Sequence, residues 1–489
     1  MSSIKTPDWV KDAIFYQIFP DRFAKSDRVA KPSNLEDWST PPTVFGFKGG
    51  DLLGVAEKLD YLSDLGINAI YFNPIFQSAA NHRYHTHDYY QVDPLLGGNQ
   101  ALRELIDLAH ARGIRIMLDG VFNHASRGFF QFNHILENGP ASPYLDWFDV
   151  HEFPINAYDH SRPAQYAAWW NLHALPKLNT ETPAVRDFLW DIAAYWVEFG
   201  IDGWRLDVPG DIDDDEFWRE FRRRVKASNP DAYICGEIWH DARRWLQGDQ
   251  FDSVMNYLFT KLAMGFFVGE NLVPELVEGV GYYPIPRIDG AQMAQEIDKL
   301  LALYSPEITY VQLNLLGSHD TARYLSIAGG DSSALKLATL FQMVYPGAPC
   351  IYYGDEVGLL GGKDPGSRGT IPWDTPEQWD QELLTFTRQA TALRHNQPAL
   401  RRGSYDTLYA QNMVYCFERR YQNEQLVVAF NAAQQTARFD LPLPGSHLTP
   451  LFGDVPLISI QNGHADIKLA PRSGAVWKVE SNTLQGNKT

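Results

Sequence analysis

Eight short apolar runs, alternating with segments of helical periodicity, constrain the fold of this chain more than any other feature. Three of the helical segments end at Gly66, Gly113 and Gly200, just before the next apolar run, which is typical of a helix C-terminus. Strands that alternate with helices form a parallel sheet, and eight such units predict a closed (β/α)8 barrel. The predicted strands are residues 13–19, 69–72, 114–119, 203–208, 232–237, 252–255, 311–316 and 350–353. The clearest predicted helices are residues 55–65, 100–112, 183–199 and 213–226.

Two stretches interrupt this alternation and predict further domains in the chain of 489 residues. The stretch after the third strand is rich in aromatic residues, Asn, His and Pro, and it is too long for an ordinary loop. From residue 398 the pattern changes to short alternating strands at 413–419, 425–431, 437–441 and 475–479, which predict an antiparallel β-sandwich. The predicted domains are a barrel (1–121 and 180–397), an inserted domain (122–179), a sandwich (398–480) and a polar tail (481–489).

Charge and composition exclude several classes of partner. The net charge of −18 argues against nucleic acid and against an anionic membrane surface. No apolar run approaches the roughly 20 residues that a membrane span needs. The first residues lack the basic and apolar regions of a signal peptide, so we expect a cytoplasmic protein. Cys235, Cys350 and Cys416 are far apart and fit neither a disulfide framework nor a metal site, so we expect them to pack in cores.

Charged groups stand at the carboxyl ends of four predicted strands, where parallel barrels carry their active sites. Asp207, Glu237 and Asp320 occupy three of these ends and should converge at one mouth of the barrel. The basic groups around them are His124, Arg205 and His319. Taken alone, Arg205 and Asp207 could be a buried ion pair, because charges inside an apolar strand are costly unless paired or used.

Three carboxylates in one pocket suit either metal-assisted hydrolysis or glycoside hydrolysis. Arg205 favours the second reaction, because a cation beside Asp207 repels a metal ion and keeps the carboxylate ionised, as a nucleophile requires. Glu237 follows an apolar strand and precedes Trp239, a setting that suits a protonated general acid. These residues favour a glycosidase, with a metal-dependent hydrolase as the alternative.

Four stretches at these strand ends resemble the signature regions of the α-amylase superfamily of retaining α-glucan enzymes. They are Asp-Gly-Val-Phe-Asn-His (119–124), Gly-Trp-Arg-Leu-Asp-Val (203–208), Gly-Glu-Ile-Trp-His (236–240) and Gly-Ser-His-Asp (317–320). The likeness extends from Ile-Phe-Tyr-Gln-Ile-Phe-Pro-Asp-Arg-Phe (14–23) to the predicted sandwich. It implies that Asp207 is the nucleophile, Glu237 the acid/base, and Asp320 the acid that distorts and holds the sugar. By the same likeness, the residues that line this subsite are His124, Arg205 and His319.

Three further motifs are similar to those of the cyclomaltodextrinase, neopullulanase and maltogenic amylase group. They are Leu-Pro-Lys-Leu-Asn (175–179), Asn-His-Arg-Tyr (81–84) and Gly-Gly-Lys-Asp-Pro-Gly-Ser-Arg (361–368). This likeness implies that Tyr84 stacks under the reacting glucose and that His82 borders it. Asp364 and Arg368 would hold the next glucose on the non-reducing side, and Trp239 would stand on the leaving-group side.

The chain also departs from that group. Most members begin with an additional β-domain that completes the partner's active site in a dimer, whereas this sequence starts at the first predicted barrel strand. We therefore expect any homodimer to have a non-standard arrangement, and the chain more closely resembles the short debranching enzymes of the group. Val-Pro-Gly-Asp (208–211) replaces the commoner Val-Ala-Asn-Glu or Val-Pro-Asn-Glu, which removes a side-chain amide at Gly210.

Metal and cofactor requirements follow from the same comparison. Residues 24–34 have few of the Asn and Asp ligands of the group's usual calcium loop, so we predict no required cofactor and no metal site. Asn123 could be a calcium ligand, as in other amylases, or a turn residue. We expect Asp88 and Asp119 to be structural.

The sequence thus predicts a retaining α-glucan hydrolase that cleaves α-1,6 branch linkages, with some α-1,4 cleavage. Its substrates would be malto-oligosaccharides, branched dextrins and cyclomaltodextrins. The alternatives are an enzyme acting chiefly on α-1,4 linkages, a transglycosylase on the same site, and a non-catalytic relative that binds glucans or partners. The presence of all three acids argues against the last. Trp169 and Trp170 are expected in a core rather than in a sugar-binding platform.

Overall fold

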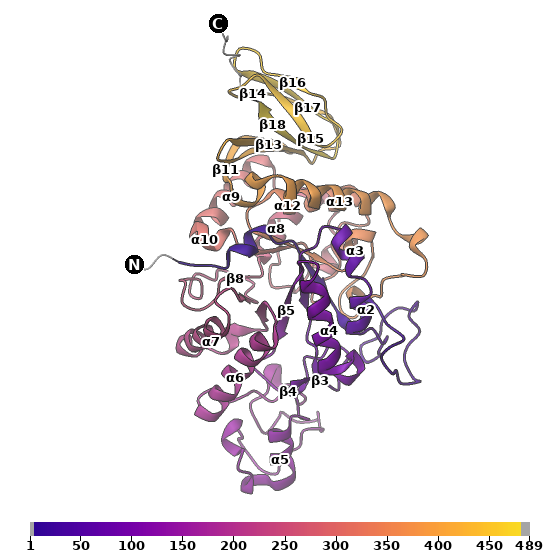
Figure 1. Cartoon of the computed structure of the whole chain (residues 1–489), viewed down its shortest axis with the longest axis vertical. Helices are drawn as coiled ribbons and strands as arrows, with labels where there is room; N and C mark the ends of the chain where they lie inside the picture. The colour runs from indigo at the N-terminus through magenta and orange to yellow at the C-terminus, as the bar shows by residue number, and fades with distance from the viewer. Residues whose placement is uncertain (1–3, 481–489) are drawn as a thin grey trace.

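The computed structural model describes residues 4–480, so the predicted tail at residues 481–489 lies outside the described residues. Figure 1 shows a barrel with its helices at the centre, a β-layer at one end and the segment around α5 (Phe130–Asn138) at the other. The predicted fold class, a (β/α)8 barrel with an insert after its third strand and a C-terminal antiparallel β-sandwich, is confirmed.

The barrel is one parallel sheet with the strand order β8-β7-β6-β5-β2-β1-β10-β9. A parallel bridge between Met255 and Leu313 joins the two ends of this order and closes the barrel. All eight predicted strands are present. Their bounds are β1 Phe15–Ile18, β2 Ala69–Phe72, β5 Arg115–Gly120, β6 Gly203–Leu206, β7 Tyr233–Gly236, β8 Ser253–Val254, β9 Leu313–Leu315 and β10 Ala348–Tyr352.

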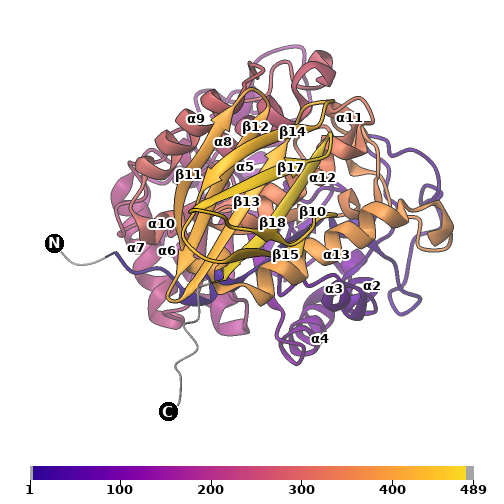
Figure 2. The same ribbon diagram turned by 90° about the horizontal axis from the view of Figure 1, so that it is seen from above.

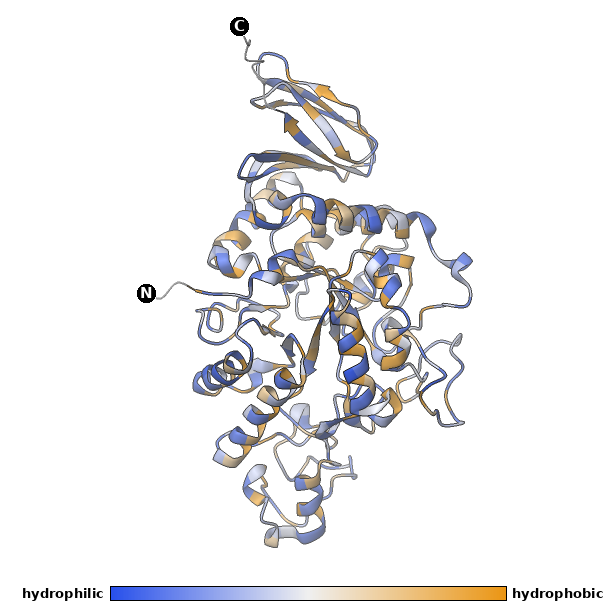
Figure 3. Cartoon of the chain, in the orientation of Figure 1, coloured by the Kyte–Doolittle hydropathy of each residue, from blue (hydrophilic) through white to orange (hydrophobic). Residues whose placement is uncertain are grey.

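Amphipathic helices surround the barrel, and Figure 3 shows hydrophobic and hydrophilic stretches on the same helices. In α7 (Asp215–Ser228), the Asp214 side chain caps the first turn by accepting from the Glu216 and Phe217 amides. The single helix predicted at residues 55–65 is instead two short helices, α2 (Leu52–Ala56) and α3 (Leu59–Asp64), so this prediction is wrong in one respect. The other helices are α1 Pro20–Phe23, α4 Gly98–His110, α6 Pro183–Phe199, α8 Tyr257–Ala263, α9 Gly290–Leu303, α10 Pro306–Thr309, α11 Tyr324–Ile327, α12 Ser332–Val344, α13 Gln381–Asn396 and α14 Pro398–Arg402.

Two irregular regions stand on the side of the barrel where the strands end. The antiparallel pair β3 (Phe76–Ser78) and β4 (Thr86–Val92) follows β2 and carries residues 79–85 in its connection. Between β5 and α6 lies the expected insert, which contains α5 and the bridges His124–Lys177 and Phe148–Leu178. The exact domain boundaries stay a prediction.

The C-terminal region is an antiparallel sheet of order β11-β12-β13-β18-β15-β16, covered on one face by the pair β14–β17. Alternation along β13 decides the packing: Val427 faces the β14–β17 pair, while Phe430 packs toward the barrel helices. Figure 2 shows this sheet lying over α9, α12 and α13. The strands are β11 Ser404–Gln411, β12 Val414–Tyr421, β13 Glu424–Asn431, β14 Ala437–Pro442, β15 His447–Phe452, β16 Ile458–Ser459, β17 His464–Leu469 and β18 Ser473–Glu480.

Two predictions from composition can be compared with the fold. Cys235, Cys350 and Cys416 are all buried as free thiols, which confirms their expected place in cores. Within residues 4–480, no helix combines the length and the apolar character that crossing a bilayer demands.

Candidate active site

Arg205 is the centre of the predicted cluster of acids. Strand pairing places it opposite Asp119 on β5, and its side chain is fully buried. Its Nη1 lies 2.7 Å from Asp119 Oδ1 and 3.0 Å from Asp207 Oδ1, while its Nη2 lies 3.0 Å from Glu237 Oε2. The ends of β5, β6 and β7 thus place three carboxylates on one guanidinium, which is more than an isolated ion pair.

The ionisation of Asp207 differs from the prediction. We expected Arg205 to favour the charged carboxylate, but burial raises the pKa of Asp207 well above its ordinary value, and Arg205 only opposes this rise. The nearby carboxylates of Glu237 and Asp119 raise it further. One cation shared among several buried acids thus offsets only part of the effect of burial on the pKa of Asp207.

Glu237 is oriented by groups on both of its oxygens. The Val208 amide donates to Oε2 at 3.0 Å, and Trp239 Nε1 donates to Oε1 at 3.1 Å. Trp239 is itself fixed by face-to-face stacking on Tyr257, with ring centroids 3.5 Å apart. An acid held in one orientation at the mouth of the barrel can transfer a proton to a substrate oxygen placed there.

Asp320 lies at the more open edge of the cluster, with its side chain 32% exposed. Its Oδ1 is 3.1 Å from His319 Nε2 and 3.6 Å from Arg368 Nη2. Burial, followed by the charge of Glu237, raises the pKa of Asp320 to about 7. Arg368 also contacts Asp364 at 3.1 Å, so the predicted pair at 361–368 reaches the cluster through Asp320.

Tyr84 joins the two halves of the site. Its hydroxyl donates to Asp119 Oδ2 at 2.8 Å and lies 2.7 Å from His319 Nε2, and its ring stacks on His319 with an interplanar angle of 9°. Asn73 and Gln17 both place amide nitrogens 3.0 Å from His319 Nδ1. Because Nδ1 then accepts, Nε2 carries the hydrogen and points to Tyr84 and Asp320.

The remaining predicted histidines border this network. His82 Nδ1 accepts from the Tyr84 amide at 3.2 Å, and burial lowers the pKa of His82 well below its ordinary value. Burial also lowers the pKa of His124 to about 3. Asn123 Nδ2 lies 3.2 Å from His124 Nδ1, and the buried His124 Nε2 has no hydrogen-bond partner among residues 4–480. Burial therefore favours the neutral form of both histidines.

The structure adds site residues that the sequence analysis missed. Gln17 and Asn73 lie directly at the ends of β1 and β2, so the strand-end rule would have found them if applied to every strand. Asp119, expected to be structural, is fully buried and accepts from the Tyr71 hydroxyl at 2.8 Å as well as from Tyr84 and Arg205. These contacts give it a positioning role inside the cluster.

The loop between α1 and α2 contains two lysines that contact acceptors of the same loop. Lys31 Nζ lies 2.8 Å from Asp51 Oδ2. Lys48 Nζ, whose side chain is fully buried, donates to the Asp37 and Thr40 carbonyl oxygens at 2.6 and 2.8 Å. Both lysine ammonium groups thus occupy acceptors in this loop. In the described part of the chain, no three His, Cys, Asp or Glu side chains are grouped to hold a metal.

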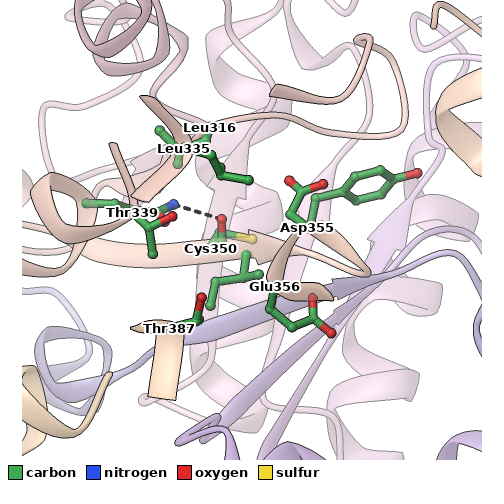
Figure 4. Close-up of a pocket in the computed structure, with 10 residues that line it drawn as sticks. Leu316, Leu335, Thr339, Cys350, Asp355, Glu356 and Thr387 are labelled. Atoms are coloured by element: carbon green, nitrogen blue, oxygen red, sulfur yellow. Dashed lines mark hydrogen bonds between the residues drawn. The ribbon is translucent and has the colours of Figure 1, made fainter. Parts of the chain in front are cut away.

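A small cavity lies between β10 and the helices that cover it, and it is separate from the catalytic cluster (Figure 4). Its volume of about 10 Å³ is near the lower limit for one water molecule, so it cannot hold a sugar. Asp355 at its edge accepts from Arg323 at 2.8 Å, and Glu356 accepts from the Tyr16 hydroxyl at 2.8 Å. These buried carboxylates fix the end of β10.

Comparison with known proteins agrees with this geometry. The family model "Alpha amylase, catalytic domain" matches residues 17–402, and "Maltogenic Amylase, C-terminal domain" matches residues 405–477. A cyclomaltodextrinase of Geobacillus thermopakistaniensis is 44% identical over 90% of this chain and 72% of its own length. Neopullulanase 2 of Thermoactinomyces vulgaris is 42% identical over 96% of this chain and 78% of its own.

Among solved structures, the debranching enzyme of Nostoc punctiforme superposes with a TM-score of 0.89 at 50% identity. The match covers 97% of this chain and 99% of that one. The two chains therefore share the fold of the barrel and of the C-terminal sheet along nearly their full length. The chain belongs to the α-amylase family, as a glycoside hydrolase of the cyclomaltodextrinase, neopullulanase and maltogenic amylase type.

Proposed function

We propose that the chain is a retaining α-glucan hydrolase in which Asp207 attacks the anomeric carbon. The observation that carries the proposal is the single guanidinium of Arg205, which holds Asp207 and Glu237 side by side. Retention requires the two carboxyl groups to be about 5–5.5 Å apart, and their contact with the same guanidinium supports a short separation of this kind. An inverting enzyme would need a wider gap with room for a water molecule.

In the first step, Glu237 gives its proton to the glycosidic oxygen as the bond from that oxygen to the anomeric carbon breaks. Asp207 forms an ester bond to the same carbon. In the second step, Glu237 removes a proton from water, the water oxygen binds the anomeric carbon, and Asp207 is released. His319 and Tyr84 are placed to bind the sugar at this position, with Asp320 holding its hydroxyls.

Asp207→Asn is the direct test of this assignment. The variant keeps the shape of the side chain but loses the nucleophile, so hydrolysis of malto-oligosaccharides should fall by a factor of about 10⁴ or more. Unfolding temperature serves as the control for folding. Turnover near the wild-type rate in a folded Asp207→Asn variant would contradict the proposal.

For linkage, we propose cleavage of α-1,6 branches with some α-1,4 hydrolysis, in malto-oligosaccharides, branched dextrins and cyclomaltodextrins. The similarity to a debranching enzyme and to a neopullulanase supports this choice. Product analysis on pullulan, amylopectin and cyclomaltodextrin tests it.

The second candidate is chiefly α-1,4 hydrolysis or transglycosylation on the same site. The likeness to a cyclomaltodextrinase favours it, since both reactions use the same covalent intermediate. Products longer than the substrate at high maltose concentration would identify transfer.

We further propose that catalysis needs no cofactor and that the loop from residue 24 to 50 needs no calcium, as the cations of Lys31 and Lys48 support. A cytoplasmic location and a homodimer of non-standard arrangement stay predictions from the sequence. Analytical ultracentrifugation tests whether the chain forms a dimer.

A further inference from the structure

Three stacked aromatic rings lead from the catalytic pocket to the surface. The His124 and Trp169 rings stack with centroids 5.1 Å apart, and Trp169 stacks on Trp170 at 4.5 Å with an interplanar angle of 12°. Trp170 is 79% exposed, so the expectation that this pair packs in a core is wrong. Both faces of Trp169 are covered, whereas the outer face of Trp170 has no ring contact among the described residues.

The exposure of Trp170 is built into the backbone. Trp170 and Asn171 have φ values of 49° and 57°, in the left-handed region that bulky residues rarely adopt. The turn is closed by Trp169 N to Leu175 O at 3.0 Å and by Leu175 N to Leu172 O at 2.8 Å. A loop that keeps a tryptophan strained and exposed, at a cost in stability, indicates a use for the ring.

The stack is attached to the segment that follows the nucleophile. Trp169 Nε1 donates to Asp211 Oδ2 at 2.8 Å, and Lys177 Nζ donates to Asp211 O at 2.8 Å. Asp211 ends the turn that begins just after Asp207. The Val208 amide in the same segment binds Glu237, which protonates the departing oxygen, so this segment borders the leaving-group side.

We propose that the outer face of Trp170 binds a glucose unit of the chain on the leaving-group side, beyond the units held in the pocket. An indole face matches the C–H surface of a pyranose, and a fixed ring loses little entropy on binding. Trp169 is the positioning residue that connects this platform to Asp211. The inference rests on the proposed function, because it takes an α-glucan chain as the ligand.

Binding to an inactive enzyme tests the platform without turnover. In the Asp207→Asn background, Trp170→Ala should weaken maltoheptaose binding by about tenfold in calorimetry, with a smaller loss for maltotriose. Phe130→Ala is the matched control, since Phe130 is an aromatic residue 63% exposed on α5 that makes edge-to-face contacts with His134 and Tyr144. It should leave both affinities unchanged, and Trp170→Tyr should keep most of the binding.

The outcomes separate this inference from the proposed function. Equal maltoheptaose affinity with and without Trp170 would overturn the platform, while hydrolysis by the active enzyme would leave the proposed function standing. Absence of any malto-oligosaccharide binding, together with absence of hydrolysis, would overturn both. In the active enzyme, Trp170→Ala should raise KM for amylopectin more than it lowers kcat, and a uniform loss in kcat would also contradict the platform.

Discussion

At the scale of the residue, the site is a set of acids that share too few cations. Arg205 alone contacts Asp119, Asp207 and Glu237, and Arg368 reaches Asp320 only at 3.6 Å. Burial raises the pKa of Asp119, Asp207 and Asp320, so ionising these acids costs folding stability as the pH rises. Function and stability are in conflict at these positions.

Asp320→Asn should therefore stabilise the protein at high pH. The pKa of Asp320 is about 7 in the folded chain, against an ordinary value of about 3.9, so the folded state binds the proton more tightly. The stability that this proton provides is complete below about pH 4 and is lost as the pH rises through 7. The unfolding temperature of Asp320→Asn should exceed the wild-type value by about 1–3 °C at pH 8 and match it at pH 4.

Asp454→Asn is the matched control, because Asp454 is exposed. Its unfolding temperature relative to the wild type should not change with pH. An unfolding temperature of Asp320→Asn below that of the wild type at pH 8 would contradict the raised pKa of Asp320. Loss of activity in this variant is expected and does not bear on this test.

At the scale of the element, the loop between α1 and α2 shows how side chains replace regular structure. Asp51 accepts from Ser26 N at 2.8 Å and caps α2, and Lys48 crosses the loop to carbonyl oxygens of residues 37 and 40. Asn81 donates to Val44 O and Gly46 O, which attaches this loop to the segment that carries His82 and Tyr84. The loop thus supports the sugar-binding side of the site.

Lys48→Met should destabilise the protein by about 2–4 kcal/mol, because the Asp37 and Thr40 carbonyl oxygens lose the donor that the buried ammonium group supplies. Urea unfolding measures this change, and Lys299→Met, 69% exposed on α9, is the control with little expected effect. EDTA should not change the unfolding temperature of the wild type. If EDTA lowered the unfolding temperature and added calcium restored it, the protein would contain a stabilising metal site, which would contradict the prediction.

At the scale of the whole molecule, the C-terminal sheet and the barrel share one core. Phe430 on β13 is fully buried, with its ring 5.3 Å from Phe267 and 5.9 Å from Phe341 on α12. The buried Arg419 donates to the Ser404 and Gly403 carbonyl oxygens beside the barrel helices. Such an interface indicates that the two regions unfold together.

Phe430→Ala should cost about 3–5 kcal/mol through the cavity it leaves and should split the calorimetric transition into two. Leu457→Ala, on an exposed turn of the same sheet, should change neither the midpoint nor the shape. A single transition at the wild-type temperature in Phe430→Ala would contradict the expected role of Phe430 in this interface. Two transitions already in the wild type would show that the sheet and the barrel unfold independently.

The sequence by itself determined the barrel, the C-terminal sandwich and the catalytic candidates. Apolar periodicity is local, and the rule that parallel strands end at one face converts order along the chain into a common site. That reasoning placed Asp207, Glu237 and Asp320 together. It missed β11 and β15, whose exposed and half-buried residues blur the alternation on which strand prediction depends. It also missed β17, although that strand alternates strictly between exposed and buried residues.

Only the tertiary structure decided how these groups act on one another. Arg205 contacts three carboxylates rather than one, and burial rather than a cation controls the pKa of Asp207. Both outcomes depend on residues that are far away in the chain. The same holds for Trp170, since its exposure comes from the closed turn and from the clamp of Trp169 on Asp211. Contact energies of this kind depend on distance and burial, which a linear pattern of residues does not encode.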